Sequence, residues 1–312
     1  MIKVGYLSAT FTHRLVAVYH AVMDQPLDAR REVTLPSGEE VPALGLGTWR
    51  LGESAPRAAA EVAALRLAFE IGYRVIDTAE MYGAGGAETV LGRAIGEAGR
   101  AGLPREKLFI VSKVLPENAD PARLVQACEA SLRRLGLDQI DLYLLHWRGG
   151  VPLADTIDGF EILQRRGWIR QWGVSNFDSA DMLELHAAAG GAACSANQVW
   201  YSLSQRGIET DLLPWQRVRQ MPMMAYCPID QGELAVHPAL ADIAERLAVT
   251  SAQVALAWVL AQRGVMAIPK ALRAAHLHDN WRAASLLLGA EDLAELDAAF
   301  PKPRRRTPLA MR

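Results

Sequence analysis

The sequence predicts an α/β fold, a closed (β/α)8 TIM barrel preceded by a β-hairpin. From residue 33 onward, short apolar runs alternate with longer amphipathic ones, as expected for parallel strands joined by right-handed helical crossovers. About eight such units occupy roughly 270 residues, which suits a closed barrel better than an open doubly wound sheet. No Pro/Ser-rich linker divides residues 33–312, so we expect them to form one barrel domain.

Each element is recognised by its local pattern. A hairpin is expected first, because Ser37 and Gly38 lie at a turn between two β-type runs. The barrel strands are expected where short apolar runs lie between turn residues, at 43–47, 73–77, 108–113, 140–146, 169–175, 195–200, 221–226 and 265–270. Amphipathic spacing predicts the helices, at 57–71, 87–98, 121–135, 153–166, 179–189, 208–219, 251–262, 274–287 and 291–300. The Pro/Arg-rich segment that follows is expected to be a surface loop.

Seven of the eight expected strands end in a polar or aromatic residue. The carboxyl ends of parallel barrel strands meet at one mouth, where barrel enzymes place their catalytic groups. A single polar strand end is explained by contact with solvent, but seven with few repeats of type predict a site. In chain order they are Asp77, Lys113, His146, Ser175 with Asn176, Gln198, Tyr226 and Lys270.

Three of these residues, Asp77, Lys113 and His146, together with Tyr82 shortly after the second strand, suit the reduction of a carbonyl group. A carbonyl that accepts a hydride becomes an alkoxide and needs a proton donor, and Tyr82 is the candidate acid. The Lys113 ammonium is expected to lower the pKa of this phenol, and Asp77 to keep the lysine charged and oriented. His146, as a neutral imidazole, is expected to position and polarise the carbonyl oxygen. Taken singly, each residue also has a structural interpretation, as an ion pair, a packing residue or a core histidine.

Eight short motifs occur in a fixed order along the chain: LGLGTW, DTAEMYG, VSKV, DLYLLHW, WGVSN, NQVWY, AYCP and AIPKA. In these motifs, from about Val33 to about Pro303, the chain resembles the aldo-keto reductases. The longer runs DTAEMYGAGGAE, CEASLRRLGLDQIDLYLLHW, RGIETDLLPW and GVMAIPKA are most similar to the bacterial reductases of methylglyoxal and other small aldehydes. The resemblance implies an NADPH-dependent oxidoreductase with the catalytic tetrad Asp77, Tyr82, Lys113 and His146.

The same resemblance implies the cofactor contacts. The nicotinamide carboxamide would meet Ser175, Asn176 and Gln198, and its ring would stack on Tyr226. Contacts toward the phosphates and the adenosine would come from Cys227, Lys270, His276 and Asn280. The run GAGGAE at 83–88 has the wrong spacing for a dinucleotide fingerprint and is interpreted as a flexible loop after Tyr82.

Three positions depart from the family pattern. Ala271 replaces a serine, His276 replaces an arginine and Cys227 replaces a serine. Arginine binds phosphate through two parallel hydrogen bonds, and histidine is a weaker partner. We therefore expect a looser grip on the 2′-phosphate of NADPH and some use of NADH.

The substrate pocket is expected to have aromatic walls. Trp49 and Trp147 match family positions that line it, and Trp200 is a further candidate. Such walls, with few cations, suit a small uncharged carbonyl compound. The short segment after Pro301 matches the specificity loop of the family and favours an open pocket with a broad range. Its arginines suggest an attraction for acidic substrates.

Composition excludes several other classes of protein. With a net charge of −2, 51% hydrophobic and 22% charged residues, nothing favours a nucleic acid or membrane partner, and no apolar stretch of about 20 residues is present. Three scattered cysteines fit a reducing, cytoplasmic setting and no metal site. The reaction needs no metal, and we expect a monomer. Residues 1–32 are interpreted as an extension, with the hypothesis that Met23 is the native start and residues 1–22 lie upstream of it.

Three alternatives remain open from the sequence. One is an aldo-keto reductase of keto-sugar acids, of the diketogulonate type. The second is a nicotinamide-binding regulatory protein with little turnover, against which the complete tetrad argues. The third is an aldolase that forms a Schiff base on Lys113, which the neighbouring phenol, imidazole and nicotinamide-type residues disfavour.

Overall fold

A computed structural model describes residues 31–312, which pack together as one structural domain. The hypothesis that Met23 is the native start concerns residues outside the described part of the chain. Of the expected N-terminal extension, residues 1–32, the structure describes only Arg31 and Glu32. The division of the chain at residue 32 therefore stays a prediction.

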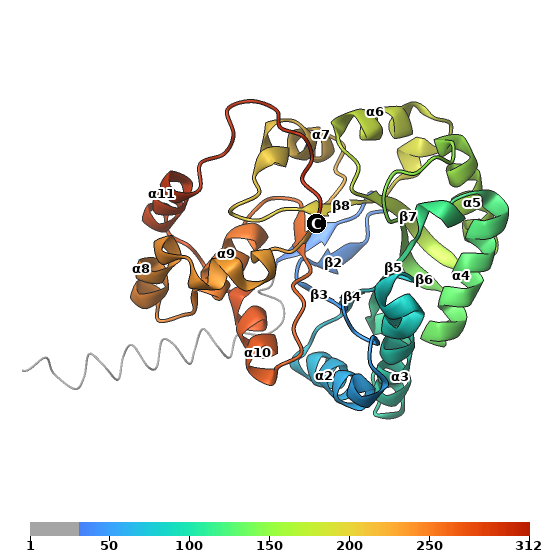
Figure 1. Ribbon diagram of the computed structural model, residues 1–312, viewed down its shortest axis with the longest axis horizontal. Helices are drawn as coiled ribbons and strands as arrows, with labels where there is room; N and C mark the ends of the chain where they lie inside the picture. Colours follow the sequence, from blue (N-terminus) through green and yellow to red (C-terminus); the bar gives the residue numbers. More distant parts are fainter. Residues whose placement is uncertain (1–30) are drawn as a thin grey trace, which may run out of the picture. The chain divides into compact units, whose positions relative to one another are not determined.

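Eight parallel strands form the centre of the fold (Figure 1). Their hydrogen-bonded order follows the sequence from β3 to β10. Two isolated bridges, Leu44 to Ala267 and Gly47 to Lys270, join the last strand to the first, which confirms the predicted closed barrel. The strands are β3 (Gly45–Gly47), β4 (Val75–Asp77), β5 (Phe109–Val114), β6 (Ile140–Leu145), β7 (Ile169–Ser175), β8 (Asn197–Trp200), β9 (Met223–Tyr226) and β10 (Val265–Ala267).

The seam between β3 and β10 requires glycine. A Cβ atom added at Gly47 would lie 2.9 Å from the backbone oxygen of Ile268, closer than real Cβ contacts. The backbones can then approach, and the Ala267 N–H donates to the Ala43 oxygen at 2.8 Å. Glycine in a strand often marks such a close approach of two backbones.

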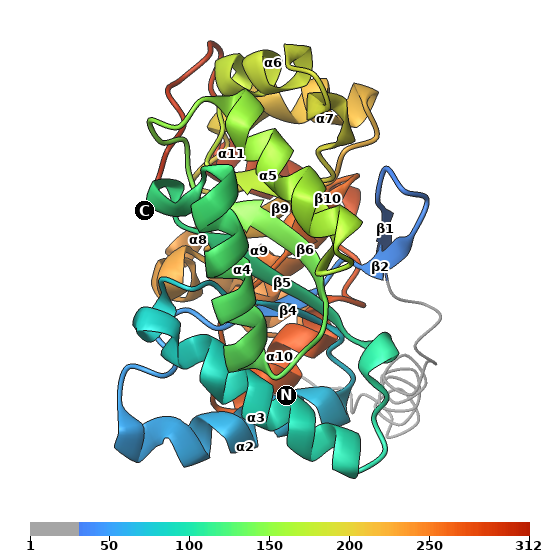
Figure 2. The same cartoon turned by 90° about the vertical axis from the view of Figure 1, so that its right-hand side faces the viewer.

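Helices surround the barrel strands, as the two perpendicular views show (Figures 1 and 2). Polar side chains fix several helix starts; Asp120, for example, accepts from the backbone N–H groups of Ala122 and Arg123. The helices are α2 (Ala58–Ile71), α3 (Gly86–Arg100), α4 (Pro121–Leu135), α5 (Leu153–Arg165), α6 (Ser179–Ala187), α7 (Leu212–Val218), α8 (Pro238–Leu247), α9 (Ser251–Leu260), α10 (Ala274–Ala283) and α11 (Ala290–Ala299).

Three helical segments differ from the sequence expectation. Helix α8 was not predicted, although Pro238 occupies its first turn, where the missing N–H of proline costs nothing. Helix α7 is shorter than expected, because residues Gly207–Thr210 form a separate 3₁₀ turn before it. Helix α10 ends at Ala283, before the expected end at residue 287. These differences concern segments outside the strands, and the order of the barrel is unaffected.

The predicted hairpin is present at the start of the described chain. Strands β1 (Glu32–Thr34) and β2 (Glu40–Pro42) pair antiparallel. The carboxylate of Glu39 accepts from Arg170 at 2.6 Å and from Gln171 at 3.0 Å, both near the start of β7. The hairpin is thus tied to the amino ends of the strands, opposite the end where the polar residues gather.

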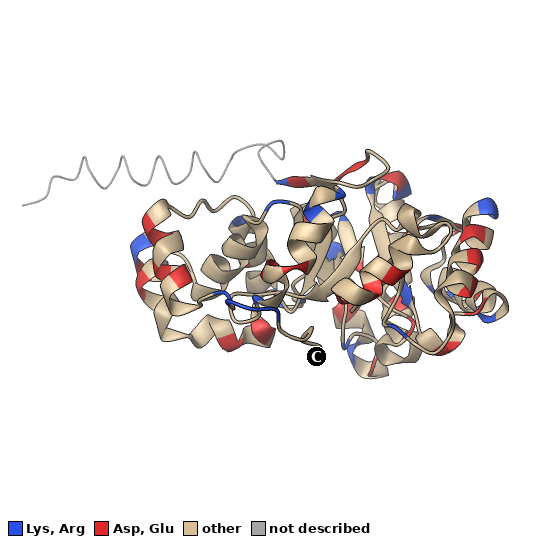
Figure 3. Cartoon of the chain, turned by 90° about the horizontal axis from the view of Figure 1, so that it is seen from above, with Lys and Arg blue, Asp and Glu red and all other residues tan. Residues whose placement is uncertain are grey.

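Charged residues of both signs are spread over the outer helices (Figure 3). A short basic stretch, Arg304 to Arg306, marks the C-terminal segment. Within residues 31–312 no single helix has the length and apolar character to cross a membrane; only α8 and α9 together reach both, and they are bent by 90° to one another.

The aromatic packing between α5 and the sheet gives a test of the core. Phe160 is fully buried, stacks on Trp172 with a centroid distance of 5.1 Å and meets Tyr143 edge-on at 6.2 Å. Phe160→Ala should lower the free energy of unfolding by about 3–5 kcal/mol, since it leaves a cavity. Urea unfolding measures this, and Val218→Ala at an 81% exposed position should change it by less than about 0.5 kcal/mol. Equal losses in the two variants would contradict this packing.

Candidate active site

One cleft of about 700 Å³ lies at the carboxyl ends of the barrel strands. Of the polar strand ends predicted from the sequence, all but Lys113 line it. The lining also includes Tyr82, from the turn after β4, and His276 and Asn280 on α10. The structure therefore gathers the predicted catalytic and cofactor residues along a single cleft, with Lys113 completely buried behind its wall.

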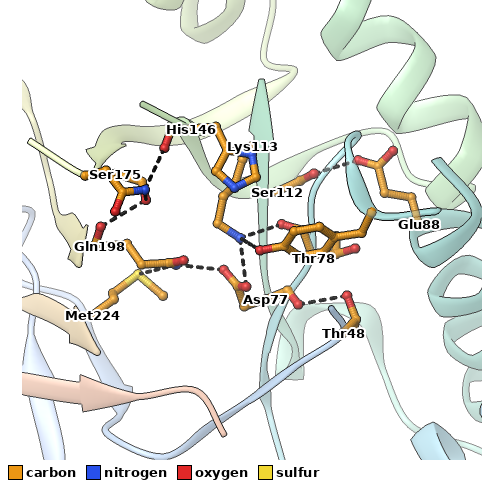
Figure 4. Close-up of polar contacts among 12 residues, drawn as sticks. Thr48, Asp77, Thr78, Glu88, Ser112, Lys113, His146, Ser175, Gln198 and Met224 are labelled. Atoms are coloured by element: carbon orange, nitrogen blue, oxygen red, sulfur yellow. Dashed lines mark hydrogen bonds and ion pairs between the residues drawn. The ribbon is translucent and has the colours of Figure 1, made fainter. Parts of the chain in front are cut away.

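Lys113 is the centre of the catalytic group (Figure 4). Its ammonium donates to Asp77 Oδ2 at 2.7 Å, to the backbone oxygen of Thr78 at 2.9 Å and to Tyr82 Oη at 3.2 Å. An ammonium has three N–H donors, so all of them are engaged. An amine held in this way is not available to attack a carbonyl carbon, which argues against the Schiff-base alternative.

Asp77 joins opposite sides of the barrel. It ends β4 and is 2% exposed. Its Oδ2 accepts from Lys113 on β5, and its Oδ1 accepts from the side-chain amide of Gln198 on β8 at 2.8 Å. Its backbone oxygen accepts from Thr48 Oγ1 at 3.0 Å. The carboxylate is thereby fixed by partners from both walls.

Tyr82 lies in a tight turn between β4 and α3. Gly83 and Gly85 of this turn have left-handed φ angles of 58° and 88°, which glycine adopts without a steric penalty. Because Tyr82 Oη accepts from Lys113, the phenolic hydrogen remains free to point at a ligand. The side chain thus faces the cleft with a donor to offer.

The pKa of Tyr82 is shifted in the direction opposite to the one expected from the sequence. Burial raises the pKa of the phenol well above its ordinary value, and the Asp77 charge adds to the rise. The lowering expected from Lys113 is outweighed, because desolvation penalises the phenolate more strongly. Burial also lowers the pKa of Lys113, while Asp77 acts in the opposite direction. Tyr82 is therefore a neutral, proton-carrying phenol at pH 7.

His146 follows β6 and is also buried, with 7% of its surface exposed. Its ring meets Tyr82 edge-on with a centroid distance of 5.7 Å. Burial, followed by the charge of Lys113, lowers the pKa of His146 to about 2. Its Nδ1 is buried and has no hydrogen-bond partner within residues 31–312. The residue also lines the cleft, where a neutral imidazole can meet a ligand atom.

The opposite side of the cleft is a connected polar network. Asn176 has a left-handed φ of 58°, and its side-chain amide donates to the backbone oxygen of His146 and to Ser175 Oγ, both at 3.2 Å. Tyr226 Oη donates to Asn176 Oδ1 at 2.9 Å, and Ser175 Oγ donates to the backbone oxygen of Gln198 at 2.9 Å. Amides, a hydroxyl and an aromatic ring are the groups that a nicotinamide carboxamide and ring would require.

Cationic side chains also line the cleft. Burial lowers the pKa of Lys270, Glu61 acts in the opposite direction, and the nearby charge of Arg50 lowers it further. An anionic ligand would relieve this clustering of cations. Cys227 lines the same cleft with a left-handed φ of 47°, and the Gln231 amide lies 3.9 Å from its sulfur. The residues fit the phosphates of a dinucleotide.

The three tryptophans proposed for the substrate pocket lie in different places. Trp49 lines the cleft and is 38% exposed. Trp147 packs on His146 with a centroid distance of 4.9 Å and is not part of the cleft lining; its expected role as a wall of the substrate pocket stays a prediction. Trp200 donates to Asp230 Oδ1 at 2.8 Å and also lies outside the lining.

Several lining residues were not anticipated, and Arg312 is the clearest case. Its backbone N–H donates to Tyr226 Oη at 3.3 Å, its guanidinium pairs with Glu233 at 2.5 Å, and it lies 5.2 Å from the Trp200 ring centroid. Arg50 and Met81 also line the cleft. The only sequence signal was the basic character of the last segment, and where a loop folds back cannot be read from its composition.

Comparisons with known proteins agree with this geometry. The profile of the aldo/keto reductase family matches residues 43–300. The chain is 49% identical over 276 residues to the methylglyoxal reductase YeaE of Escherichia coli, with 87% of this chain and 95% of that protein covered. It is 32% identical over 263 residues to the methylglyoxal reductase DkgB of Escherichia coli O157:H7, with 82% and 93% covered.

The chain is also similar, in fold and in sequence, to solved structures of aldo-keto reductases. An aldo/keto reductase from Klebsiella pneumoniae, crystallised with NADP and acetate, matches with a TM-score of 0.86 and 46% identity. The match covers 90% of this chain and 99% of that one. An aldo-keto reductase from the same organism, in complex with NADPH, matches with a TM-score of 0.86 and 47% identity over the same shares of both chains.

The buried imidazole gives a test of the site. Because the pKa of His146 is lowered to about 2, its ring should stay neutral from about pH 5 to about pH 8, where an ordinary histidine titrates. The ¹⁵N signals of His146, assigned by their loss in His146→Asn, should not shift over this range. A titration near the ordinary histidine pKa would show that the ring is open to water.

Proposed function

The chain belongs to the aldo/keto reductase family, and on that premise we propose that it is an NADPH-dependent reductase of small aldehydes and ketones such as methylglyoxal, with Tyr82 as the general acid. The expected monomeric state and cytoplasmic location stay predictions. The observation that carries the proposal is the direction of one hydrogen bond. Lys113 donates to Tyr82 Oη, which leaves the phenolic hydrogen to be given to a substrate.

Each residue of the site has a separate role in the proposed reduction. When bound, NADPH supplies the hydride that reduces the carbonyl carbon. Tyr82 holds the proton, because burial keeps the phenol neutral by raising its pKa. Lys113, at 3.2 Å, stabilises the phenolate as the proton leaves for the much more basic alkoxide. Asp77 keeps the ammonium oriented and does not itself need to exchange a proton.

His146 is suited to orient the carbonyl oxygen. Since its imidazole is neutral, it can act as a hydrogen-bond donor without competing with Tyr82 as an acid. Its ring contacts both Tyr82 and Trp147, which restricts its rotation. A carbonyl oxygen held between an imidazole and a phenol is polarised before hydride arrives.

The cofactor assignment rests on the chemistry of the second half of the cleft. Ser175, Asn176, Gln198 and Tyr226 would hold the nicotinamide, and Lys270 with His276 and Asn280 would hold the adenosine phosphates. The proteins of known structure from Klebsiella pneumoniae that this chain resembles were crystallised with NADP and NADPH. The presence of all these groups in one cleft supports the same cofactor here.

Methylglyoxal is proposed as a substrate because two relatives are named for its reduction. A small dicarbonyl compound fits a cleft mouth bordered by Trp49 and Met81. The keto-sugar acid alternative is supported by one observation, the guanidinium of Arg312 in the cleft lining. That cation is already paired with Glu233, so we favour uncharged substrates. A panel of methylglyoxal, glyoxal and diketogulonate separates the two, and kcat/KM should be highest for the uncharged compounds.

Removing the phenolic hydroxyl tests the assignment of the acid. Tyr82→Phe should lower kcat for methylglyoxal by about a hundredfold or more, because the proton donor is lost. The Kd for NADPH, measured by protein fluorescence, should change by less than about twofold, since the residue does not hold the cofactor. Retention of full turnover would defeat the assignment. Wild-type protein that binds NADPH but reduces no aldehyde would favour the regulatory alternative.

The histidine at position 276 tests the cofactor preference. His276→Arg should tighten NADPH binding by about tenfold, because arginine binds the 2′-phosphate through two hydrogen bonds. Binding of NADH, which lacks that phosphate, should change by less than about twofold and serves as the matched control. An equal gain for both cofactors would place residue 276 away from the 2′-phosphate.

A further inference from the structure

A second buried ionic cluster lies beside the catalytic group, outside the cleft. Glu88, in the first turn of α3, is completely buried. Its Oε1 accepts from Ser112 Oγ at 2.6 Å, and its Oε2 accepts from Arg134 Nε at 2.6 Å. Arg134 also donates to Ser131 Oγ at 3.1 Å. The carboxylate therefore ties together α3, α4 and β5, and none of these bonds is needed to bind a substrate or a cofactor.

The strand geometry connects this cluster with Lys113. Ser112 and Lys113 are neighbours on β5, and successive side chains of a strand point to opposite faces. Figure 4 shows Ser112 directed to Glu88 and Lys113 directed to Asp77 and Thr78. A bond that holds Ser112 on the outer face therefore also fixes the position from which the ammonium of Lys113 reaches the site.

The same cluster supports the turn that carries Tyr82. A Cβ atom added at Gly85 would lie 2.6 Å from both Cδ and Nε of Arg134, so the arginine side chain lies directly against this turn. On the other side, a Cβ atom at Gly83 would lie 2.8 Å from the backbone oxygen of Leu51. The turn is held between these two surfaces, and Glu88 fixes the arginine that forms one of them.

We propose that Glu88, acting through Ser112 and Arg134, is a positioning residue that sets the distance between Lys113 Nζ and Tyr82 Oη. The proposal rests on the function proposed for Tyr82. Glu88 lies three residues after the turn and bonds next to Lys113, so it is linked to both members of the pair. Tight support of such groups matters, since displacements of about 1 Å can cost large factors in rate.

The charge of Glu88 also supports Lys113, because it favours the ammonium form of that side chain. Burial lowers the pKa of Lys113, and the carboxylates of Asp77 and Glu88 both oppose this shift. Loss of the Glu88 charge would therefore weaken the ammonium form that donates to Tyr82. Arg134 would at the same time lose the partner of its Nε and its fixed place against Gly85.

Glu88→Gln is the direct test, since it keeps the size of the side chain and removes its charge. Asp141→Asn is the matched control. Asp141 is also buried, at 3% exposed, pairs with Arg105 at 2.7 Å and accepts from the Ile110 N–H at 2.7 Å on the same strand β5. Asp141 lies on β6 and bonds to the amino end of β5, away from Tyr82. Both variants lose a buried carboxylate that holds β5, and they differ in which end of the strand is released.

We expect Glu88→Gln to lower kcat with NADPH and methylglyoxal by tenfold or more, with the KM for NADPH changed by less than twofold. The deuterium isotope effect on kcat with deuterated NADPH should rise, because hydride and proton transfer become slower than product release. Asp141→Asn should lower the melting temperature while kcat stays within twofold of wild type. A kcat of Glu88→Gln that also stays within twofold would reduce Glu88 to a structural residue and overturn the proposal.

Two further measurements keep the proposal testable. If Glu88→Gln does not fold, Ser112→Ala and Arg134→Lys are used, and unchanged kcat and KM in both would overturn it. The ¹³Cζ resonance of Tyr82, assigned by its loss in Tyr82→Phe, should shift in Glu88→Gln and not in Asp141→Asn. This signal does not depend on turnover. A wild-type protein without reductase activity would refute the proposed function, and an unmoved resonance would refute the positioning role.

Discussion

The ion pair between Lys113 and Asp77 is the interaction on which the site depends. The two side chains are 0% and 3% exposed, and taking such charges out of water is costly unless further hydrogen bonds satisfy them. Here Thr78, Tyr82 and Gln198 provide those bonds. Because Gln198 reaches Asp77 from β8, across the barrel from β4, the pair has its full set of hydrogen bonds only when the barrel is closed. The site is therefore complete only when the barrel has closed, and the close approach of the β3 and β10 backbones at Gly47 allows that closure.

Much of the fold was readable from the sequence, since apolar runs and helical periodicity mark strands and helices directly. The strand ends were readable as well, because seven polar or aromatic ends in one barrel, unlike a single one, are not explained by contact with solvent alone. Helix α8 was missed since Pro238 suggests a break, whereas the first turn of a helix tolerates it. The pKa of Tyr82 was misjudged because desolvation depends on everything around the ring. The contact of Trp147 with His146 and the contacts of Arg312 could not be read from the sequence for a related reason: the direction of a side chain and the path of a tail are set by tertiary contacts.

The cleft combines neutral and cationic groups. Tyr82 and His146 are neutral, because burial raises the pKa of the phenol and lowers that of the imidazole, whereas Lys270 and Arg50 bring positive charge. In the proposed reaction, the neutral groups would meet the substrate and the cations would hold the anionic cofactor. The same cleft contains a network of amides and hydroxyls bonded to each other, which is rigid before any ligand arrives.

The complete engagement of the Lys113 ammonium has a consequence for chemical durability. Reactive dicarbonyl compounds damage proteins by adding to free amines and guanidinium groups. A lysine that donates all three of its hydrogens and exposes none of its surface offers no lone pair to such an electrophile. If Lys113 were a solvent-facing base, a reductase of these compounds would be inactivated by its own substrate. In the proposed reaction, burial would therefore protect the amine that supports Tyr82, and any slow glycation would fall first on the exposed arginines of the cleft lining, Arg50 and Arg312.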